Sequence, residues 1–172
     1  EYEIILVGNE LWYDLAKDLP HWDKVIPVNF HKFKTISRYR RYILKQIKNL
    51  QADIAIQPTF SREFYHGDSL ARASGAFRKV SSSGDMSNRN RLKKWLANRW
   101  HTELIPATNN SLTELERNAE FFSFLSGEAY HCVYPKLNFP KKMIPQLHEG
   151  EFFYALVPGA STNLKKWLPE FF

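Results

Sequence analysis

The sequence predicts an α/β protein in which a parallel β-sheet is flanked by helices. Short apolar runs rich in β-branched residues recur along the first third of the chain, as expected of strands buried on both faces. Stretches with apolar residues at helical spacing separate these runs. Such alternation of strand and helix is typical of βαβ units, whose strands lie parallel in a single sheet.

Three strands and two helices are expected before residue 58. The strands are Ile4–Val7, Val25–Val28 and Asp53–Gln57, and the helices are Leu11–Leu19 and Ser37–Leu50. Proline cannot donate a hydrogen bond to a sheet, so Pro27 favours an edge position or a strand end for the second strand.

A second group of elements is expected after a polar loop. Gly67–Ala73 predicts a short helix, and Gly75–Val80 predicts a turn that enters another strand. Ser111–Glu114 matches the capping box, in which Ser or Thr is followed three positions later by Glu. The pattern therefore predicts a helix over Leu112–Leu125, which Gly127 ends.

The composition changes near the end of the chain, where three prolines fall within residues 134–145. This composition is typical of a linker. We predict a first domain over residues 1–133, a linker over 134–150 and the start of a second domain over 151–172. The chain begins with Glu inside an apolar strand and stops where a helix should continue, so we expect a fragment of a longer protein.

Composition and charge narrow the class of protein. The single cysteine, Cys132, excludes an internal disulfide framework and a multi-cysteine metal site, and the six histidines show no metal-ligand spacing. No apolar run approaches the ~20 residues that cross a bilayer, so we expect a soluble, cytoplasmic protein. The net charge of +6 and the pI near 9.4 suit nucleic acid, an anionic membrane surface or phosphorylated small molecules, and do not choose among them.

A candidate phosphate-binding segment lies near the end of the chain. The apolar run Phe152–Val157 stops at Pro158 and Gly159, and small or hydroxylated residues follow. Such a turn leaves backbone N–H groups free to meet phosphate oxygens, and Lys165 could add a positive charge. The alternative is an ordinary strand, turn and surface helix, and the residue types alone leave both open.

Two other segments carry candidate functional residues. Residues 59–63 follow a predicted strand, and ligands bind at the carboxyl ends of parallel strands. Residues 89–100 hold five basic side chains interleaved with Trp95 and Trp100, as in proteins that bind single-stranded nucleic acid. The simpler alternative is a surface segment on which the tryptophans pack and the charges stay in water.

Several segments, in this order, resemble the glycosyltransferase family that contains the ADP-heptose:lipopolysaccharide heptosyltransferases. Ala52–Ile56, leading into Ser61–Glu63, is similar to the family's Asp-led strand and the acceptor-facing loop after it. Gly75–Val80 is similar to the family's Gly-Ala-x-x-Arg/Lys strand entry. Glu114–Asn118 is similar to a helical segment of the Glu-x-Asn type.

The most specific likeness lies in the second predicted domain. Val157–Ser161, followed by Lys165 and Trp167, resembles the family's His/Pro-Gly-Ala…Lys-x-Trp-Pro motif, with the proline displaced to Pro169. The resemblance implies the GT-B fold, in which two Rossmann-like domains hold the acceptor mainly in the first and the nucleotide sugar mainly in the second. It assigns contact with the donor diphosphate to Gly159, Ala160, Ser161, Thr162 and Lys165.

The resemblance also implies an activity and its partners. The reaction is transfer of a heptose-like sugar from a nucleotide diphosphate sugar to lipopolysaccharide core or another cell-surface glycan, without a metal or other cofactor. The expected partners are the nucleotide sugar, an anionic glycan or lipid-linked acceptor, and the cytoplasmic face of the membrane as a peripheral contact, but no nucleic acid. The acceptor-side candidates are Ser61, Arg62, Arg78 and Lys79.

The chain departs from the family at its start. The family begins with a strand and a Gly-Asp loop that carries the catalytic carboxylate, whereas this chain opens at what resembles the next strand. We therefore expect the catalytic base before residue 1 and no activity from this chain alone. Two alternatives stay open: a non-catalytic α/β module that binds nucleic acid or another anion through residues 89–100, and a family relative that keeps the fold without catalysis.

Overall fold

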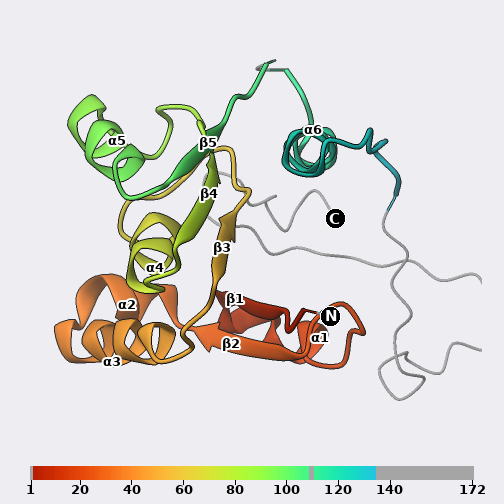
Figure 1. Ribbon diagram of the computed structural model, residues 1–172. Helices are drawn as coiled ribbons and strands as arrows, with labels where there is room; N and C mark the ends of the chain where they lie inside the picture. The colour runs from red at the N-terminus through yellow and green to blue at the C-terminus, as the bar shows by residue number, and fades with distance from the viewer. Residues whose placement is uncertain (1, 109–110, 135–172) are drawn as a thin grey trace, which may run out of the picture. The chain divides into compact units, whose positions relative to one another are not determined.

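The computed structural model describes residues 2–108 and 111–134, which form an α/β fold with two small parallel sheets flanked by helices (Figure 1). The predicted α/β class is confirmed. The strands are β1 (Ile5–Asn9), β2 (Lys24–Val28), β3 (Ile54–Gln57), β4 (Arg78–Ser82) and β5 (Glu103–Ile105). The helices are the 3-10 turn η1 (Glu10–Trp12), α1 (Tyr13–Ala16), α2 (Phe30–Thr35), α3 (Ser37–Lys48), α4 (Gly67–Ala73), α5 (Arg91–Asn98) and α6 (Glu114–Ser126). None of these helices is long and apolar enough to cross a membrane.

Every strand pairing in this part of the chain is parallel, as the alternation of strands and helices predicts. β1 pairs with β2 along its whole length. In the other sheet β4 lies between β3 and β5. Pro27 stands opposite Gly8, and β1 is the only described strand that pairs with β2. The predicted edge position of Pro27 is therefore confirmed for the described residues.

The predicted helix over Leu11–Leu19 is confirmed only in part. The chain forms η1 and the four-residue α1 there, and the Leu11 side chain is 86% exposed. Asn9 caps the turn, because its side chain accepts a hydrogen bond from the Leu11 backbone N–H at 3.1 Å. The leucine spacing predicts one continuous α-helix, but the first turn is 3-10, with about three residues per turn, and α1 ends at Ala16, before Leu19.

The prediction misses α2, α5 and β5. Both helices have an asparagine N-cap: the Asn29 side chain accepts from the Lys32 N–H at 2.8 Å, and the Asn90 side chain accepts from the Lys93 N–H at 2.9 Å. Asparagine is a strong N-cap residue, so these two starts were recognisable in the sequence. β5 has three residues, which is too short for alternation to reveal.

The start of α6 differs from the predicted capping box. Thr113, rather than Ser111, is the N-cap, and the Glu116 carboxylate accepts a hydrogen bond from the Thr113 backbone N–H at 2.7 Å. The helix therefore begins at Glu114, two residues later than predicted, because the same motif occurs twice in this register. Gly127 ends the helix with a φ of +75°, as predicted.

Two apolar clusters form the core. The larger cluster joins β2, α2, α3 and α4 and consists of Ile26, Val28, Phe33, Ile43, Ile47 and Leu70. The smaller cluster joins β4, β5 and α6 and consists of Val80, Ile105 and Phe121. Apolar side chains thus hold α2, α3, α4 and α6 to the sheets.

β3 is less buried than predicted. Ile54 is 39% exposed and Ile56 is 46% exposed, although the apolar run predicts a strand buried on both faces. The prediction of a buried strand is wrong for the described residues. β3 lies at the edge of its sheet, where β4 is its only described neighbour.

Candidate functional site

The loops after β3 and β4 lie against each other and form the candidate site. The Ser61 hydroxyl, in the loop after β3, donates a hydrogen bond to the Asp85 carboxylate at 3.0 Å. The Asp85 backbone N–H donates to the Phe60 carbonyl at 3.3 Å, and the Asn88 side-chain amide donates to the Ser61 carbonyl at 2.8 Å. Ligands bind at this edge of parallel sheets, so the architecture and the polar side chains indicate the same place.

Asp85 is an ionised carboxylate at this edge of the sheet. Burial by itself raises the pKa of Asp85, but hydrogen bonds from Ser87 and Ser61 and the positive charge of Arg89 outweigh it, so the pKa lies below its ordinary value. A carboxylate with a lowered pKa accepts hydrogen bonds well and is a weak base at neutral pH. Asp85 is therefore suited to orienting a ligand hydroxyl rather than to removing its proton.

Arg62 holds the two loops together from inside the protein. Its side chain is fully buried, and its guanidinium donates to the Ser81 hydroxyl at 2.8 Å, the Ser82 carbonyl at 2.7 Å and the Asn98 side chain at 2.6 Å. Burial lowers the pKa of Arg62 to about 10, while the charge of Asp68 opposes this shift. Arg62 is thus still a cation at neutral pH, and it ties the first loop to the end of β4.

Asp68 is the centre of a buried group of charged side chains, here called the ion network, which comprises Arg62, Asp68, Arg89 and His101. One Asp68 carboxylate oxygen lies 3.2 Å from Arg62 Nε and 3.1 Å from His101 Nε2. The other oxygen accepts a hydrogen bond from Arg89 Nη1 at 3.1 Å. All four side chains have no exposed surface, so their positions are set by one another.

The interior behind the two loops carries more positive than negative charge. Two guanidinium groups face one carboxylate in the ion network. Burial lowers the pKa of Arg89, against the effect of Asp68. Lys94 lies close by, and its Nζ donates to the Gly84 carbonyl at 2.7 Å. Burial, followed by the positive charges of Arg89 and Arg62, lowers the pKa of Lys94, as expected of an electropositive region.

Helix α6 reaches the loop after β3. Its Arg117 is 6% exposed, and the guanidinium carbon lies 3.4 Å from the centre of the Phe60 ring. Cation–π contacts are worth roughly 2 kcal/mol when they are desolvated. α6 is therefore a further element that positions the loop of the candidate site.

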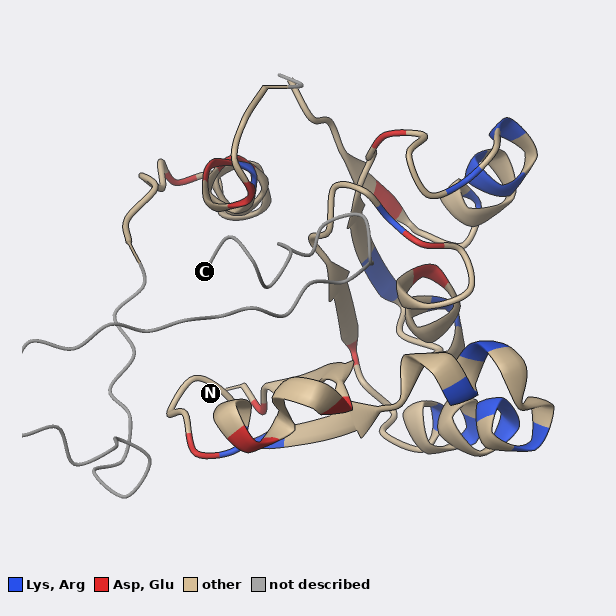
Figure 2. Ribbon diagram, turned by 180° about the vertical axis from the view of Figure 1, so that it is seen from behind, with Lys and Arg blue, Asp and Glu red and all other residues tan. Residues whose placement is uncertain are grey.

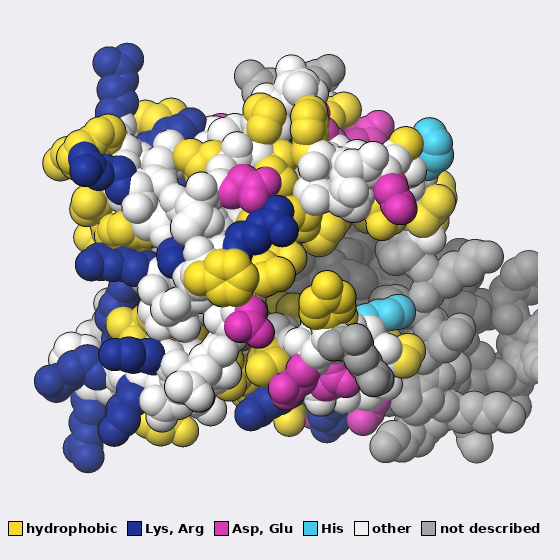
Figure 3. All heavy atoms as spheres, viewed as in Figure 1, with side chains coloured by type: hydrophobic (Ala, Val, Ile, Leu, Met, Phe, Trp, Pro, Cys, Tyr) yellow, Lys and Arg dark blue, Asp and Glu magenta, His cyan; other side chains and the backbone are white. Residues whose placement is uncertain are grey.

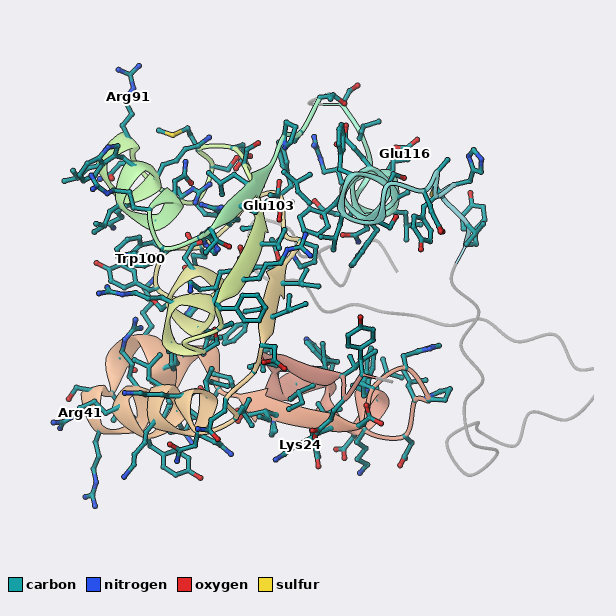
Figure 4. All side chains as sticks on the ribbon, viewed as in Figure 1. Lys24, Arg41, Arg91, Trp100, Glu103 and Glu116 are labelled. Carbon is teal, nitrogen blue, oxygen red and sulfur yellow. The ribbon has the colours of Figure 1, made fainter. Side chains whose placement is uncertain are left out.

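The acceptor-side residues predicted from the sequence fall into two separate groups. Ser61 and Arg62 lie at the carboxyl end of the sheet, whereas Arg78 and Lys79 begin β4 at the other end. Arg78 is paired with Glu103 at 2.9 Å. Glu103 is labelled on β5 in Figure 4. The Lys79 ammonium group donates to the Ala76 carbonyl. Five residues of β4 span about 13 Å, so the two groups do not form one site.

Sequence reasoning missed Asp68 and His101 and gave Arg89 a different role. Arg89 is one of the five basic side chains of residues 89–100, for which nucleic-acid binding was the alternative left open, but it is buried against Asp68. The one local signal was an aspartate inside a short helix whose neighbouring residues are small or apolar. Trp95 of the same segment is 56% exposed, and Trp100 is half-buried under the Arg72 guanidinium.

The remaining predicted site residues lie outside the described residues. These are the donor diphosphate residues Gly159, Ala160, Ser161, Thr162 and Lys165. The predicted linker, except for residue 134, and the predicted second domain lie outside them as well. Within residues 2–108 and 111–134, no group of three or more His, Cys, Asp or Glu side chains could hold a metal ion.

A hollow of about 310 Å³ lies along another side of α6. Its lining is mostly apolar and consists of Leu115, Asn118, Ala119, Phe122 and residues 130–133. Neither the ion network nor any acceptor-side candidate lines this hollow.

Comparison of the chain with known protein families, with curated proteins and with solved structures finds no match.

Proposed function

We propose that the chain is the acceptor-side part of a glycosyltransferase that moves a heptose-like sugar from a nucleotide diphosphate sugar to an anionic cell-surface glycan. The observation that carries the proposal is the meeting of two polar loops over an electropositive interior at the carboxyl ends of β3 and β4. This is the edge at which sheets of this class bind their ligands.

We propose further that the two parallel sheets belong to one Rossmann-like sheet. In the doubly wound strand order 3-2-1-4-5-6, the strands 3-2 correspond to β2-β1 and the strands 4-5-6 to β3-β4-β5. In this proposal strand 1 would precede β1 along the chain and lie between β1 and β3. The exposure of Ile54 and Ile56 supports this proposal. If another strand paired with β3, the side chains of that strand would lie beside Ile54 and Ile56 and cover them.

The proposed chemistry uses residues from both domains. Backbone N–H groups after Pro158, together with Lys165, would stabilise the charge on the departing diphosphate. Ser61 and Asp85 would orient the acceptor, since they offer a hydroxyl and an ionised carboxylate at the same edge. The general base that removes the proton of the acceptor hydroxyl is expected in the segment before residue 1.

Donor binding by the full-length protein is the first test. Lys165→Ala should weaken binding of a nucleotide diphosphate sugar by about 10-fold or more, because a charge-assisted hydrogen bond is worth roughly 1.5–3 kcal/mol. Lys166→Ala is the matched control, since it removes the neighbouring lysine that the resemblance does not assign. Equal donor affinity in the two variants, measured by calorimetry, would count against the proposal.

Acceptor kinetics are the second test. With a panel of glycan acceptors, Ser61→Ala should raise the KM for the acceptor and leave the KM for the donor unchanged. Arg78→Gln should change neither KM, because Arg78 is paired with Glu103 at the opposite end of β4. A larger effect from Arg78→Gln than from Ser61→Ala would place the acceptor at the other end of the sheet.

A further inference from the structure

The basic side chains of this protein are concentrated on particular helices. No Asp or Glu occurs in residues 24–51 or in residues 86–102, and these two segments hold eight and five Lys or Arg residues. α6, in contrast, has three Glu residues and one Arg. Figure 2 shows the same asymmetry, with Lys and Arg gathered on α2, α3 and α5.

Helices α3 and α5 border one continuous surface. The Tyr65 side chain lies between them: the Arg40 guanidinium of α3 is 5.9 Å from the centre of its ring, and the Lys93 ammonium of α5 is 4.9 Å from it. Arg40 also donates to the Tyr65 carbonyl at 2.9 Å. The basic face, as we call this surface, consists of Arg38, Arg41, Lys45, Lys48, Arg91, Lys93 and Arg99. Figure 3 shows Lys and Arg side chains along this edge of the molecule.

The four basic residues of α3 form one stripe of the helix. Arg38, Arg41, Lys45 and Lys48 follow one another at intervals of three or four residues, which places them on a single side. All four are exposed. Ile43 and Ile47 of the same helix are buried in the core, so the basic stripe faces away from the protein.

Helix α5 turns an apolar stripe toward solvent. Leu92 is 70% exposed, Trp95 is 56% exposed and Leu96 is 37% exposed, and their spacing places them on one face of the helix. Ala97 is the one buried residue of α5. A helix that buries one alanine fully, and exposes leucine and tryptophan among lysines and arginines, has the pattern of a helix that lies in a membrane interface.

We propose that the basic face binds peripherally to an anionic lipid bilayer, with Leu92 and Trp95 inserted among the lipid headgroups and the α3 stripe held by lipid charge. Tryptophan favours the membrane interface, and each Lys or Arg near an anionic surface adds about 1 kcal/mol. The surface binds lipid whether or not the chain transfers sugar, because none of these residues belongs to the candidate site.

The observations favour a bilayer over nucleic acid as the partner. Exposed leucines gain free energy by leaving water for lipid, whereas a phosphate backbone offers them no apolar contact. Arg89 is buried in the ion network and is absent from the surface. The Arg99 guanidinium lies 4.9 Å from the centre of the Trp95 ring, so one side of that ring is already occupied where a base would stack.

Vesicle co-sedimentation with the 172-residue chain tests the proposal. The chain should bind vesicles that contain phosphatidylglycerol, bind less as salt rises, and fail to bind vesicles of phosphatidylcholine alone. The double variant Arg41→Gln, Lys45→Gln should weaken this binding about 30-fold, because each basic residue near an anionic surface contributes about 1 kcal/mol of binding free energy. Lys17→Gln with Lys24→Gln removes the same charge outside the basic face and should weaken it much less.

The apolar contribution is tested separately. Leu92→Ser with Trp95→Ser should weaken binding to phosphatidylglycerol vesicles at least 10-fold, whereas Phe124→Ser, at a residue 53% exposed on α6, should not. Equal loss from both variants, or no binding to anionic vesicles at low salt, would overturn the proposal. Binding to a single-stranded oligonucleotide without binding to vesicles would overturn it in favour of nucleic acid. No nucleotide sugar enters these assays, so their outcome is separate from that of the proposed transferase.

Discussion

The two sides of this protein are held together by different kinds of interior. Around β1 and β2 the core is apolar and includes Phe33, Ile43 and Ile47. Beside β4 the interior contains the smaller apolar cluster and also the ion network, in which Asp68 faces two buried guanidinium groups. Apolar packing is non-directional, whereas buried charges are tolerated only in one arrangement of hydrogen bonds. The comparison indicates that the β4 side is built for a defined geometry rather than for burial alone.

The hydrogen bonds of the ion network reach the backbone of the candidate site. Arg62 and Arg89 donate to the carbonyl groups of Ser82 and Ser83, which are the residues where β4 passes into its loop. The ion network therefore fixes the backbone of the loop that meets Ser61. The larger apolar cluster does not fix the backbone of a loop in this way, because its side chains have no hydrogen-bonding groups.

Removal of the central carboxylate should have the largest effect. Asp68→Asn keeps the size of the side chain and leaves two buried guanidinium groups without their counter-charge, so the free energy of unfolding should fall by about 3–5 kcal/mol. Urea denaturation measures this change. Asp53→Asn, at an exposed aspartate, should change stability by less than about 0.5 kcal/mol. A loss below about 1 kcal/mol for Asp68→Asn would show that the ion network is not what holds this side together.

Gly84 provides the next largest effect, with Gly127 as its matched control. Both glycines have positive φ angles, of +58° and +75°, where a side chain costs about 1–2 kcal/mol. A Cβ at Gly84 would also lie 2.3 Å from the Phe60 carbonyl oxygen, whereas a Cβ at Gly127 would meet nothing within 4 Å. Gly84→Ala should therefore lower the melting temperature clearly more than Gly127→Ala. Equal losses would mean that the two loops of the candidate site are not closely packed.

A conservative change in the apolar core should have a smaller effect. Ile43→Val removes one methylene group from a residue 2% exposed, and the expected loss is about 0.5–1.5 kcal/mol in urea denaturation. Ile43→Val changes the volume of a side chain and Asp68→Asn changes only its charge, so the two losses of stability compare the apolar core directly with the ion network. If Ile43→Val lowered the free energy of unfolding more than Asp68→Asn, stability would depend more on the apolar core than on the ion network.

The smallest change in stability is expected from Asp85→Asn, and it is expected only at acidic pH. The folded-state pKa of Asp85 lies below its ordinary value of about 3.9, so its contribution to stability is present above that pH and is lost as pH falls through the lowered value. Asp85→Asn should therefore lose less stability than the unaltered chain between about pH 4 and pH 2. Thermal melts across this range measure the difference. Parallel curves would show that the hydrogen bonds from Ser87 and Ser61 do not stabilise the charged carboxylate.

Much of the fold was predictable because it depends on short segments of sequence. The apolar runs, the helical spacing of α3 and the glycine that ends α6 are local patterns, and each appears within two residues of the expected position. The helix over Leu11–Leu19 is shorter than predicted, because Asn9 caps a 3-10 turn that the leucine spacing does not reveal and α1 ends at Ala16. The exposure of β3 was also hidden, because it depends on which strands pair with it.

The candidate site was predictable only in part. The position of Ser61 and Arg62 after a strand follows from the sequence, since the strand and its end are local features. The burial of Arg62 and the exposure of Trp95 do not follow from it, because both depend on which segments pack against these side chains.

The sequence by itself determined the class of fold, the direction of the strands and the edge of the sheet where the polar loops fall. The tertiary structure decided which charges are interior and which face solvent. Asp68 and His101 are 33 positions apart and lie 3.1 Å from each other in the protein. Electrostatic pairing depends on distance in space and on the exclusion of water, and neither is a property of neighbouring residues along the chain.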